Sequence, residues 1–259
     1  SALLDHRYPP STAESWNAPG TVCGDSAQPG ERVMFAVDPT AAVVDEALAW
    51  GADLLFTHHP LFLRPVHSVA ATTYKGALVH RLIRGGCALH AAHTNADAAA
   101  GGVAEALATA VGLVDLVPLT PLERPVAGSD AAGGATGIGR VGRLPVPMSL
   151  RHFGEKVAAA IPATEQGVRI AGDLDGTVTT VAVVGGSGDS LFDAVRSAGV
   201  DAYVTADLRH HPASELRERA AFEAGGSDPH RGRPALVDVA HAASEWPWLA
   251  GAAATLERD

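Results

Sequence analysis

The sequence predicts an α/β fold with a largely parallel sheet, and three observations support this prediction. Short apolar runs with strand character alternate with longer helix-like segments along most of the chain. Several predicted strands end at a polar cluster that contains histidine, and both halves of the chain share this layout. The 259 residues are 47% hydrophobic, which is enough to bury a core in one large domain or two small lobes.

The first half of the chain carries three strand signals and three helix signals. We expect strands at residues 32–37, 53–57 and 87–92. Asp38-Pro39-Thr40 is a typical helix start, and this helix is expected to run to about Trp50 and to stop at Gly51. Further helices are predicted at residues 74–84 and at about 103–111.

The middle and the second half of the chain follow the same alternation. Residues 121–142 contain few large apolar side chains and many glycines, so we expect a flexible crossing between lobes there. The Gly185–Gly188 segment is predicted as a turn, and a helix from Asp189 to Ala198 follows it. Strands are predicted at residues 178–184, 201–205 and 235–239, a loop at 225–234, and a short helix after His241.

Composition excludes several classes of protein. The formal net charge is −10, from 19 basic and 29 acidic residues, which disfavours a nucleic-acid partner because nucleic acids attract positive charge. No apolar run approaches the ~18 residues of a membrane span, and the first residues lack an export signal, so no membrane association is expected. The chain has only two cysteines, Cys23 and Cys87, which are too few for a disulfide framework, so a cytoplasmic location is expected for the protein. Both cysteines are expected to be small residues of the core.

The polar clusters lie where a ligand site is expected. Sites in open α/β sheets form beyond the carboxyl ends of the strands. Four predicted strand ends carry histidine or carboxylate groups, at residues 57–60, 93–97, 207–211 and 241–245. With twelve histidines and only two cysteines in the chain, any metal chemistry should use nitrogen and oxygen ligands.

Spacing within these clusters suits two metal ions. His241 and Glu245 are four residues apart, which places both side chains on one face of a helix. His58 and His59 point apart, toward two different metals, if the strand stays extended as Pro60 favours; otherwise the chain turns there. Asp97 adds a carboxylate, and a carboxylate can bridge two cations ~3.5–4 Å apart.

Four blocks of the sequence closely resemble the NIF-three-like dinuclear-metal-centre family, whose members are known as GTP cyclohydrolase type 2 homologues. The blocks follow the family's order over most of the chain. They are GADLLFTHHPLFLRPV (51–66), AAHTNADAAAGGVAEALA (91–108), VAVVGGSGDSLFDAVRSAGVDAYVTADLRHHPA (181–213) and LVDVAHAASEWPWL (236–249). The resemblance implies two interlinked α/β lobes with a dinuclear metal site in the cleft between them. We expect a first lobe at residues 1–123, completed by about 236–259, and a second lobe at 124–235.

The resemblance also implies the metal ligands and the assembly. Five residues match the family's ligand positions, and they are His58, His59, Asp97, His241 and Glu245. They imply two divalent metal ions per chain, and three histidines with two carboxylates suit Zn, Mn, Fe, Co or Ni without choosing among them. The family forms a ring-shaped homohexamer of three dimers, and this chain resembles the short form without the inserted middle domain.

Four positions depart from the family pattern. Asn17 stands where the family usually has aspartate, and Pro19 where it has an aliphatic residue. Ala240 and Ala242 replace the glycine and aromatic residues that commonly flank the last histidine. None of these is a ligand position, so the departures concern the substrate rather than metal binding.

Several polar residues near the expected site keep open roles. Three roles are open for His93: it caps the end of a strand, it orients a metal ligand, or it transfers protons. Asp207, His210 and His211 either contact substrate and transfer protons or are exposed surface groups.

Two other features have alternative interpretations. Leu191 occupies the third glycine position of the dinucleotide fingerprint, which argues against nicotinamide binding, although the Gly185–Gly188 turn could still bind a phosphate at the next helix start. Trp246 and Trp248 are expected to pack in the core rather than stack on a ligand.

These observations predict a metal-dependent hydrolase acting on a small, nucleotide-like substrate. Two cations sharing Asp97 would activate a water molecule and polarise the bond under attack. The cyclohydrolase reaction, opening of the guanine ring of GTP, comes from the resemblance alone. The alternatives are a phosphoesterase acting on nucleotides or nucleic acid, and a non-enzymatic metal-binding ring or scaffold.

Overall fold

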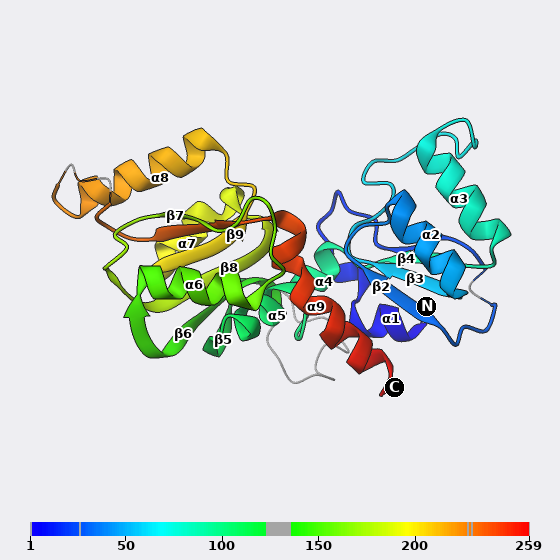
Figure 1. Cartoon of the computed structure of the whole chain (residues 1–259), viewed down its shortest axis with the longest axis horizontal. Helices are drawn as coiled ribbons and strands as arrows, with labels where there is room; N and C mark the ends of the chain where they lie inside the picture. The colour runs from blue at the N-terminus through cyan, green and yellow to red at the C-terminus, as the bar shows by residue number, and fades with distance from the viewer. Residues whose placement is uncertain (1, 26, 123–135, 227, 229, 259) are drawn as a thin grey trace. The chain divides into compact units, whose positions relative to one another are not determined.

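The computed structural model describes residues 2–25, 27–122, 136–226, 228 and 230–258 (Figure 1). They form two compact α/β units. The first contains the described residues up to Ala99 and from Ala253 onward, and the second contains those from Ala100 to Ala252. This division differs from the expected lobes, because residues 236–252 belong to the second unit and not to the first.

The first unit is built around a sheet with the strand order β1-β4-β3-β2. Strands β2, β3 and β4 are parallel, and β1 pairs antiparallel with β4. The strands are β1 (Gly20–Cys23), β2 (Val33–Ala36), β3 (Leu54–Thr57) and β4 (Ala88–Ala91). The helices are α1 (Ala2–Arg7), η1 (Pro10–Thr12), α2 (Ala41–Trp50), α3 (Tyr74–Arg84) and α4 (Thr94–Ala98).

Local sequence signals explain where α2 begins and ends, and packing holds it on the sheet. The Thr40 side chain accepts a hydrogen bond from the Val43 backbone N–H, and Gly51 ends the helix in the left-handed region at φ +76°. Helices α2 and α3 bury one face of the sheet, in a core that includes Val44, Leu82 and Leu89. The strands and helices predicted for this half are confirmed.

The second unit contains a larger sheet with the order β5-β6-β8-β9-β10-β7. Its strands are β5 (Val114–Pro121), β6 (Gly137–Ser149), β7 (Arg169–Ala171), β8 (Thr177–Ser187), β9 (Ala202–Ala206) and β10 (Ala235–Val239). Its helices are α5 (Val103–Ala110), α6 (Leu150–Ala160), η3 (Asp189–Leu191), α7 (Phe192–Ala198), α8 (His210–Glu223) and α9 (His241–Leu256). The last turn of α9 belongs to the first unit.

Strand β8 shows how the second sheet buries both of its faces. Val181 and Val183 point into a core shared with α5 and α6, which includes Leu107 and Phe153. Ala182 and Val184 point to the other face, where a second core includes residues of α7 and α8. The result is a sheet between two layers of helices (Figure 1).

Several expectations are corrected by this fold. The second sheet is mixed rather than largely parallel, because β5, β6 and β8 pair antiparallel and β7 adds an antiparallel edge to β10. The first sheet is largely parallel, as expected. The expected crossing at residues 121–142 lies outside the described residues at 123–135, and from Gly137 onward it is strand β6. The helix predicted at residues 189–198 is divided into η3 and α7, and the short helix after His241 is the 16-residue α9.

The expectations for the tryptophans are confirmed for one residue and wrong for the other. Trp248 is buried as predicted, whereas Trp246 is 54% exposed and does not pack in the core. Cys87 is buried and Cys23 half-buried, and burial raises the pKa of both thiols. None of the helices in the described part of the chain has the length and apolar character that a membrane crossing requires.

Candidate metal centre

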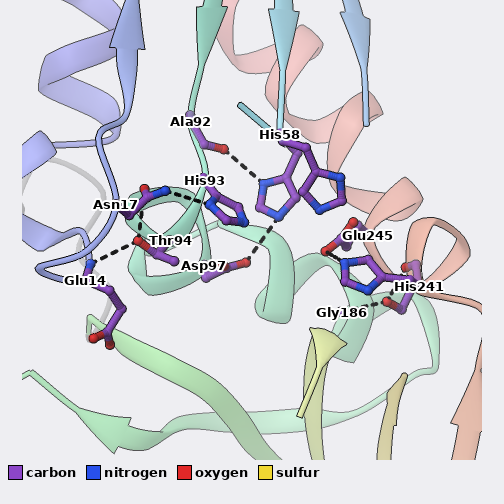
Figure 2. A network of polar contacts seen from close by, with 12 residues as sticks. Glu14, Asn17, His58, Ala92, His93, Thr94, Asp97, Gly186, His241 and Glu245 are labelled. Atoms are coloured by element: carbon purple, nitrogen blue, oxygen red, sulfur yellow. Dashed lines mark hydrogen bonds and ion pairs between the residues drawn. The ribbon is translucent and has the colours of Figure 1, made fainter. Parts of the chain in front are cut away.

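The first unit gathers three histidines and one carboxylate, which we call the first-unit cluster: His58, His59, His93 and Asp97. One ring nitrogen of each histidine lies within 4.8 Å of one from each of the others. Nε2 of His58 lies 3.6 Å from Oδ1 of Asp97 (Figure 2). Each of these residues follows the carboxyl end of a parallel strand, as the sequence predicted.

Sheet register brings the cluster together. Thr57 and Ala91, the last residues of β3 and β4, are paired neighbours, so the residues that follow them emerge at one edge. The backbone N–H groups of His58 and His59 still donate to Ala36 and Val37, which extends the ladder to β2. The chain bends at both histidines, and their ring centroids are 4.9 Å apart. Of the two arrangements that the sequence allowed, an extended strand or a turn of the chain, the structure therefore has the turn.

A hydrogen bond from Nδ1 orients each of the two adjacent histidines. Nδ1 of His58 donates to the Ala92 carbonyl oxygen at 2.9 Å, and Nδ1 of His59 donates to Oδ1 of Asp38 at 2.8 Å. Because both partners are acceptors, each Nδ1 carries the proton and each Nε2 keeps a lone pair for a metal ion. Asp38 thus contacts a predicted ligand, which the sequence did not indicate, because Asp38 was expected only to start a helix.

His93 and Asp97 are joined through α4. The Asp97 N–H donates to the His93 carbonyl oxygen at 3.0 Å, so the two side chains are one helical turn apart. His93 differs from the other histidines of the cluster because its Nδ1 lies 2.8 Å from the amide nitrogen of Asn17 (Figure 2).

The second unit holds the other predicted ligands, His241 and Glu245, in the first turns of α9. Nε2 of His241 lies 3.0 Å from Oε1 of Glu245, which confirms that the i, i+4 spacing places both on one helix face. On its other side, Nδ1 of His241 lies 2.6 Å from Oδ2 of Asp207. Hydrogen bonding and charge from Glu245, and then from Asp207, raise the pKa of His241 to about 9 against the opposing effect of burial.

Asp207 is held in an unusual backbone conformation just after β9. Its φ is +55°, a region that non-glycine residues seldom adopt. The turn is tied down on both sides, because the Leu208 N–H donates to Asp238 at 3.4 Å and the Arg209 side chain pairs with Asp189 at 2.6 Å. The Asp207 carboxylate therefore contacts a predicted ligand, a role that the sequence did not indicate, and its expected role in substrate contact or proton transfer stays a prediction.

His210 and His211 lie at the start of α8. Both are exposed, and their rings contact each other with centroids 5.1 Å apart. Their expected roles in substrate contact or proton transfer remain predictions.

The Gly185–Gly188 segment supports the second-unit ligands and does not form the predicted turn. Strand β8 continues through it to Ser187. The Gly186 N–H donates to Oγ of Ser244 at 2.8 Å, and its carbonyl accepts from Thr205 at 2.9 Å. A Cβ at position 186 would lie 2.7 Å from Oε1 of Glu245 and 2.9 Å from Nε2 of His241. The phosphate-binding interpretation is therefore wrong at Gly186, whose backbone groups are already bonded.

The donor set fits divalent transition metals. His58, His59 and His241 each have an acceptor on Nδ1, as most histidine ligands of metal sites do. Nε2 of His58 and His59 therefore keeps a lone pair, and Nε2 of His241 gains one when its ring loses the second proton. Carboxylates accompany them in each unit, with Asp97 beside His58 and Glu245 beside His241. Imidazole and carboxylate donors suit Zn, Mn, Fe, Co and Ni.

Fold and side chains thus define an α/β protein with histidine and carboxylate groups able to hold metal. The profile of the family described as Duf34/NIF3 (NGG1p interacting factor 3) matches residues 1–259. The chain belongs to this family, as the sequence resemblance indicated.

Individual relatives agree with this assignment. A Streptomyces coelicolor protein named GTP cyclohydrolase 1 type 2 homolog is 52% identical over 254 residues, covering 98% of this chain and 83% of the relative. A hypothetical Staphylococcus aureus protein superposes with a TM-score of 0.82 at 27% identity, over 99% of this chain and 89% of its own. A Bacillus cereus protein related to NIF3 shares the fold with a TM-score of 0.82 at 24% identity, over 99% of this chain and 91% of the Bacillus cereus chain.

Proposed function

We propose that this protein is a metal-dependent hydrolase that holds two divalent cations and acts on a small, nucleotide-like substrate. The ligands are His58, His59, Asp97, His241 and Glu245. One observation carries the proposal: Nδ1 of His58 and of His59 is bonded to an acceptor, so each Nε2 keeps its lone pair for a metal ion before one binds. Nδ1 of His241 is held by Asp207 in the same way, so loss of its second proton to a metal leaves the lone pair on Nε2. Relatives named GTP cyclohydrolase 1 type 2 homolog support the choice of substrate class.

The chemistry divides between the ions and the chain. Bound divalent cations lower the pKa of a water molecule and polarise the bond it attacks. Asp38 and Asp207 keep their histidine partners in the tautomer that binds metal, and Asp207 adds negative charge that makes the His241 ring a stronger donor. Asp97 is the carboxylate placed to neutralise positive charge beside His58.

Metal content is the first test. Elemental analysis of the purified chain should find two equivalents per chain, and a His58→Ala, His241→Ala double variant should lose metal. An unchanged metal count in that variant would contradict the ligand assignment.

Turnover is the second test. The metal-loaded protein is offered GTP and a panel of phosphodiesters while formate and phosphate release are measured. Formate release from GTP supports the cyclohydrolase reaction, whereas phosphate release supports a phosphoesterase. Asp97→Ala should abolish either activity, and Asp175→Ala, which removes an 86% exposed carboxylate, is the matched control. If the protein holds two metals and releases neither product, the hydrolase proposal is wrong and a non-enzymatic metal-binding ring or scaffold is supported.

The family resemblance also leads us to propose a homohexamer of three dimers, and the two cysteines lead us to propose a location in the cytoplasm. Native mass spectrometry or light scattering of the metal-loaded protein tests the assembly, since a monomer or a dimer at working concentration would contradict it.

A further inference from the structure

A chain of hydrogen bonds leads from the backbone to His93. The Glu14 N–H donates to Oγ1 of Thr94 at 3.0 Å, and the Thr94 hydroxyl donates to Oδ1 of Asn17 at 3.3 Å (Figure 2). With its oxygen used as an acceptor, Asn17 directs its amide nitrogen at His93, and Nδ2 lies 2.8 Å from Nδ1 of the ring. Thr94 is buried and Asn17 is half-buried, so this chain is part of the packed structure.

The direction of the last bond decides which ring nitrogen of His93 carries the proton. An amide nitrogen only donates, so Nδ1 of His93 accepts and keeps its lone pair for Asn17. A neutral imidazole has one N–H group, which must then be at Nε2. His58 and His59 have the opposite arrangement, because their Nδ1 atoms face acceptors.

We infer that His93 is a hydrogen-bond donor to a substrate oxygen and not a metal ligand, and that Asn17 is the positioning residue that sets its tautomer. A protonated Nε2 has no lone pair to give to a cation. The His93 ring lies among the ligands, with its centroid 5.2 Å from that of His58 and 5.5 Å from that of His59. An N–H group beside two metal-binding nitrogens is placed to stabilise negative charge that develops on an oxygen atom during hydrolysis. The inference rests on the proposed hydrolase function for its substrate, but not for the tautomer.

A carboxylate at position 17 would reverse this arrangement. Asn17→Asp replaces the donor with an acceptor of nearly the same shape, so His93 would move its proton to Nδ1 and expose a lone pair at Nε2. The same nitrogen would then be able to bind a cation, as Nε2 of His58 and His59 is proposed to do.

Nitrogen NMR tests the tautomer directly. The full chain is labelled with ¹⁵N-histidine and studied metal-free and loaded with diamagnetic Zn²⁺, and His93→Gln identifies the His93 signals by their loss. We expect a protonated Nε2 and an unprotonated Nδ1 in both states. Asn17→Asp should reverse the two assignments, while Gln28→Glu, the same amide-to-acid change at an exposed position, should not. A protonated Nδ1 in the wild-type protein, or a direct Zn²⁺ bond at Nε2, would overturn the inference.

Metal content gives an independent measurement. His93→Gln should keep the wild-type number of bound metal ions, whereas His58→Gln should lose metal. Loss of one equivalent from His93→Gln, with an unchanged melting temperature, would show that His93 is a ligand. If a substrate is found, His93→Ala, which removes the N–H donor, should lower kcat by about 10²- to 10³-fold, and a kcat within twofold of wild type would contradict the donor role. Absence of any turnover would count against the proposed function but would leave the NMR result intact.

Discussion

Nδ1 of His241 lies 2.6 Å from Oδ2 of Asp207, a residue that adopts a φ of +55° just after strand β9. The strained backbone is held by Asp238 and by the Arg209–Asp189 pair. Such strain persists where the surrounding structure fixes it, and it is common at functional sites. Here it delivers a carboxylate to the ring nitrogen opposite the one that faces Glu245.

The first prediction concerns this contact. Asp207→Asn keeps an acceptor for Nδ1 and tolerates the left-handed backbone, but it removes the negative charge. Metal affinity should fall by about 10- to 100-fold, the usual effect of losing a carboxylate behind a histidine ligand. Competition titration with a chelating dye measures this change. The control is Asp193→Asn, at a fully exposed carboxylate of the same unit. Equal metal affinities for the two variants would show that the Asp207 charge does not strengthen metal binding.

The second prediction concerns pH. The metal-free protein holds a proton on His241 with a pKa of about 9, and a metal ion must displace it. Affinity should therefore rise by about tenfold per pH unit until pH 9 and then level off. Proton release on metal addition, followed by calorimetry in buffers of different ionisation enthalpy, provides the measurement. A flat affinity between pH 7 and 9 would be inconsistent with this pKa.

The same pKa sets a trend for the metal-free protein. Because the folded pKa lies above the unfolded value of 6.5, the stabilisation from His241 is complete below pH 6.5 and is lost as pH rises through 9. The free energy of unfolding of the metal-free protein should thus decrease as the pH rises from 6.5 through 9. In His241→Gln this part of the pH dependence should disappear, and its persistence would assign the effect to another group.

The third prediction concerns Gly186. A methyl group at this buried position would lie under 3 Å from Oε1 of Glu245 and Nε2 of His241, so the metal-binding ends of both side chains would have to shift. Gly186→Ala should reduce metal binding by at least tenfold. Gly199→Ala is matched to it, because Gly199 has a similar φ of +65° and open space around its Cβ position. Both variants carry backbone strain, so metal binding that falls equally in both would exclude the specific clash.

The fourth prediction concerns His90, which is buried and whose Nδ1 lies 3.2 Å from Oγ1 of Thr21. Burial lowers the pKa of its imidazole from 6.5, so the folded protein keeps it neutral while the unfolded chain protonates it. Its contribution to stability is therefore complete above pH 6.5 and falls as pH decreases from that value through the folded pKa. Urea denaturation at pH 7 and pH 5 should show a smaller decrease for His90→Gln than for wild type. A larger decrease in the variant would refute the assignment.

Predictability from sequence differed between the two units for a physical reason. In the first unit, β2, β3, β4, α2 and α3 alternate with clear start and stop signals such as Thr40 and Gly51, and these five elements were predicted, whereas α1, η1, β1 and α4 were not. In the second unit, glycines hid strand β6, because glycine was interpreted as flexibility. A Cβ at Gly139 would meet Val184 at 2.9 Å, and one at Gly142 would meet Leu116 at 2.6 Å. These glycines are therefore a requirement of close strand packing.

The candidate site shows the same limit. The helical spacing of His241 and Glu245 and the strand-end position of His58 are local properties, and a local pattern predicted them. Asp38 and Asp207 act through contacts with His59 and His241, 21 and 34 residues away in sequence. No periodicity or motif marks such a partner, because the contact exists only once the strands have paired.

The register between Thr57 and Ala91 has an energetic consequence for ligand binding. The backbone ladder that pairs β3 with β4 also fixes where the cluster residues start, and Ala92 then anchors the His58 ring. Ordering of these rings is thus completed when the unit folds, and an arriving cation need not restrict them again. Metal binding should accordingly change the shape of the first unit very little, because the energetic cost of ordering these rings is met during folding.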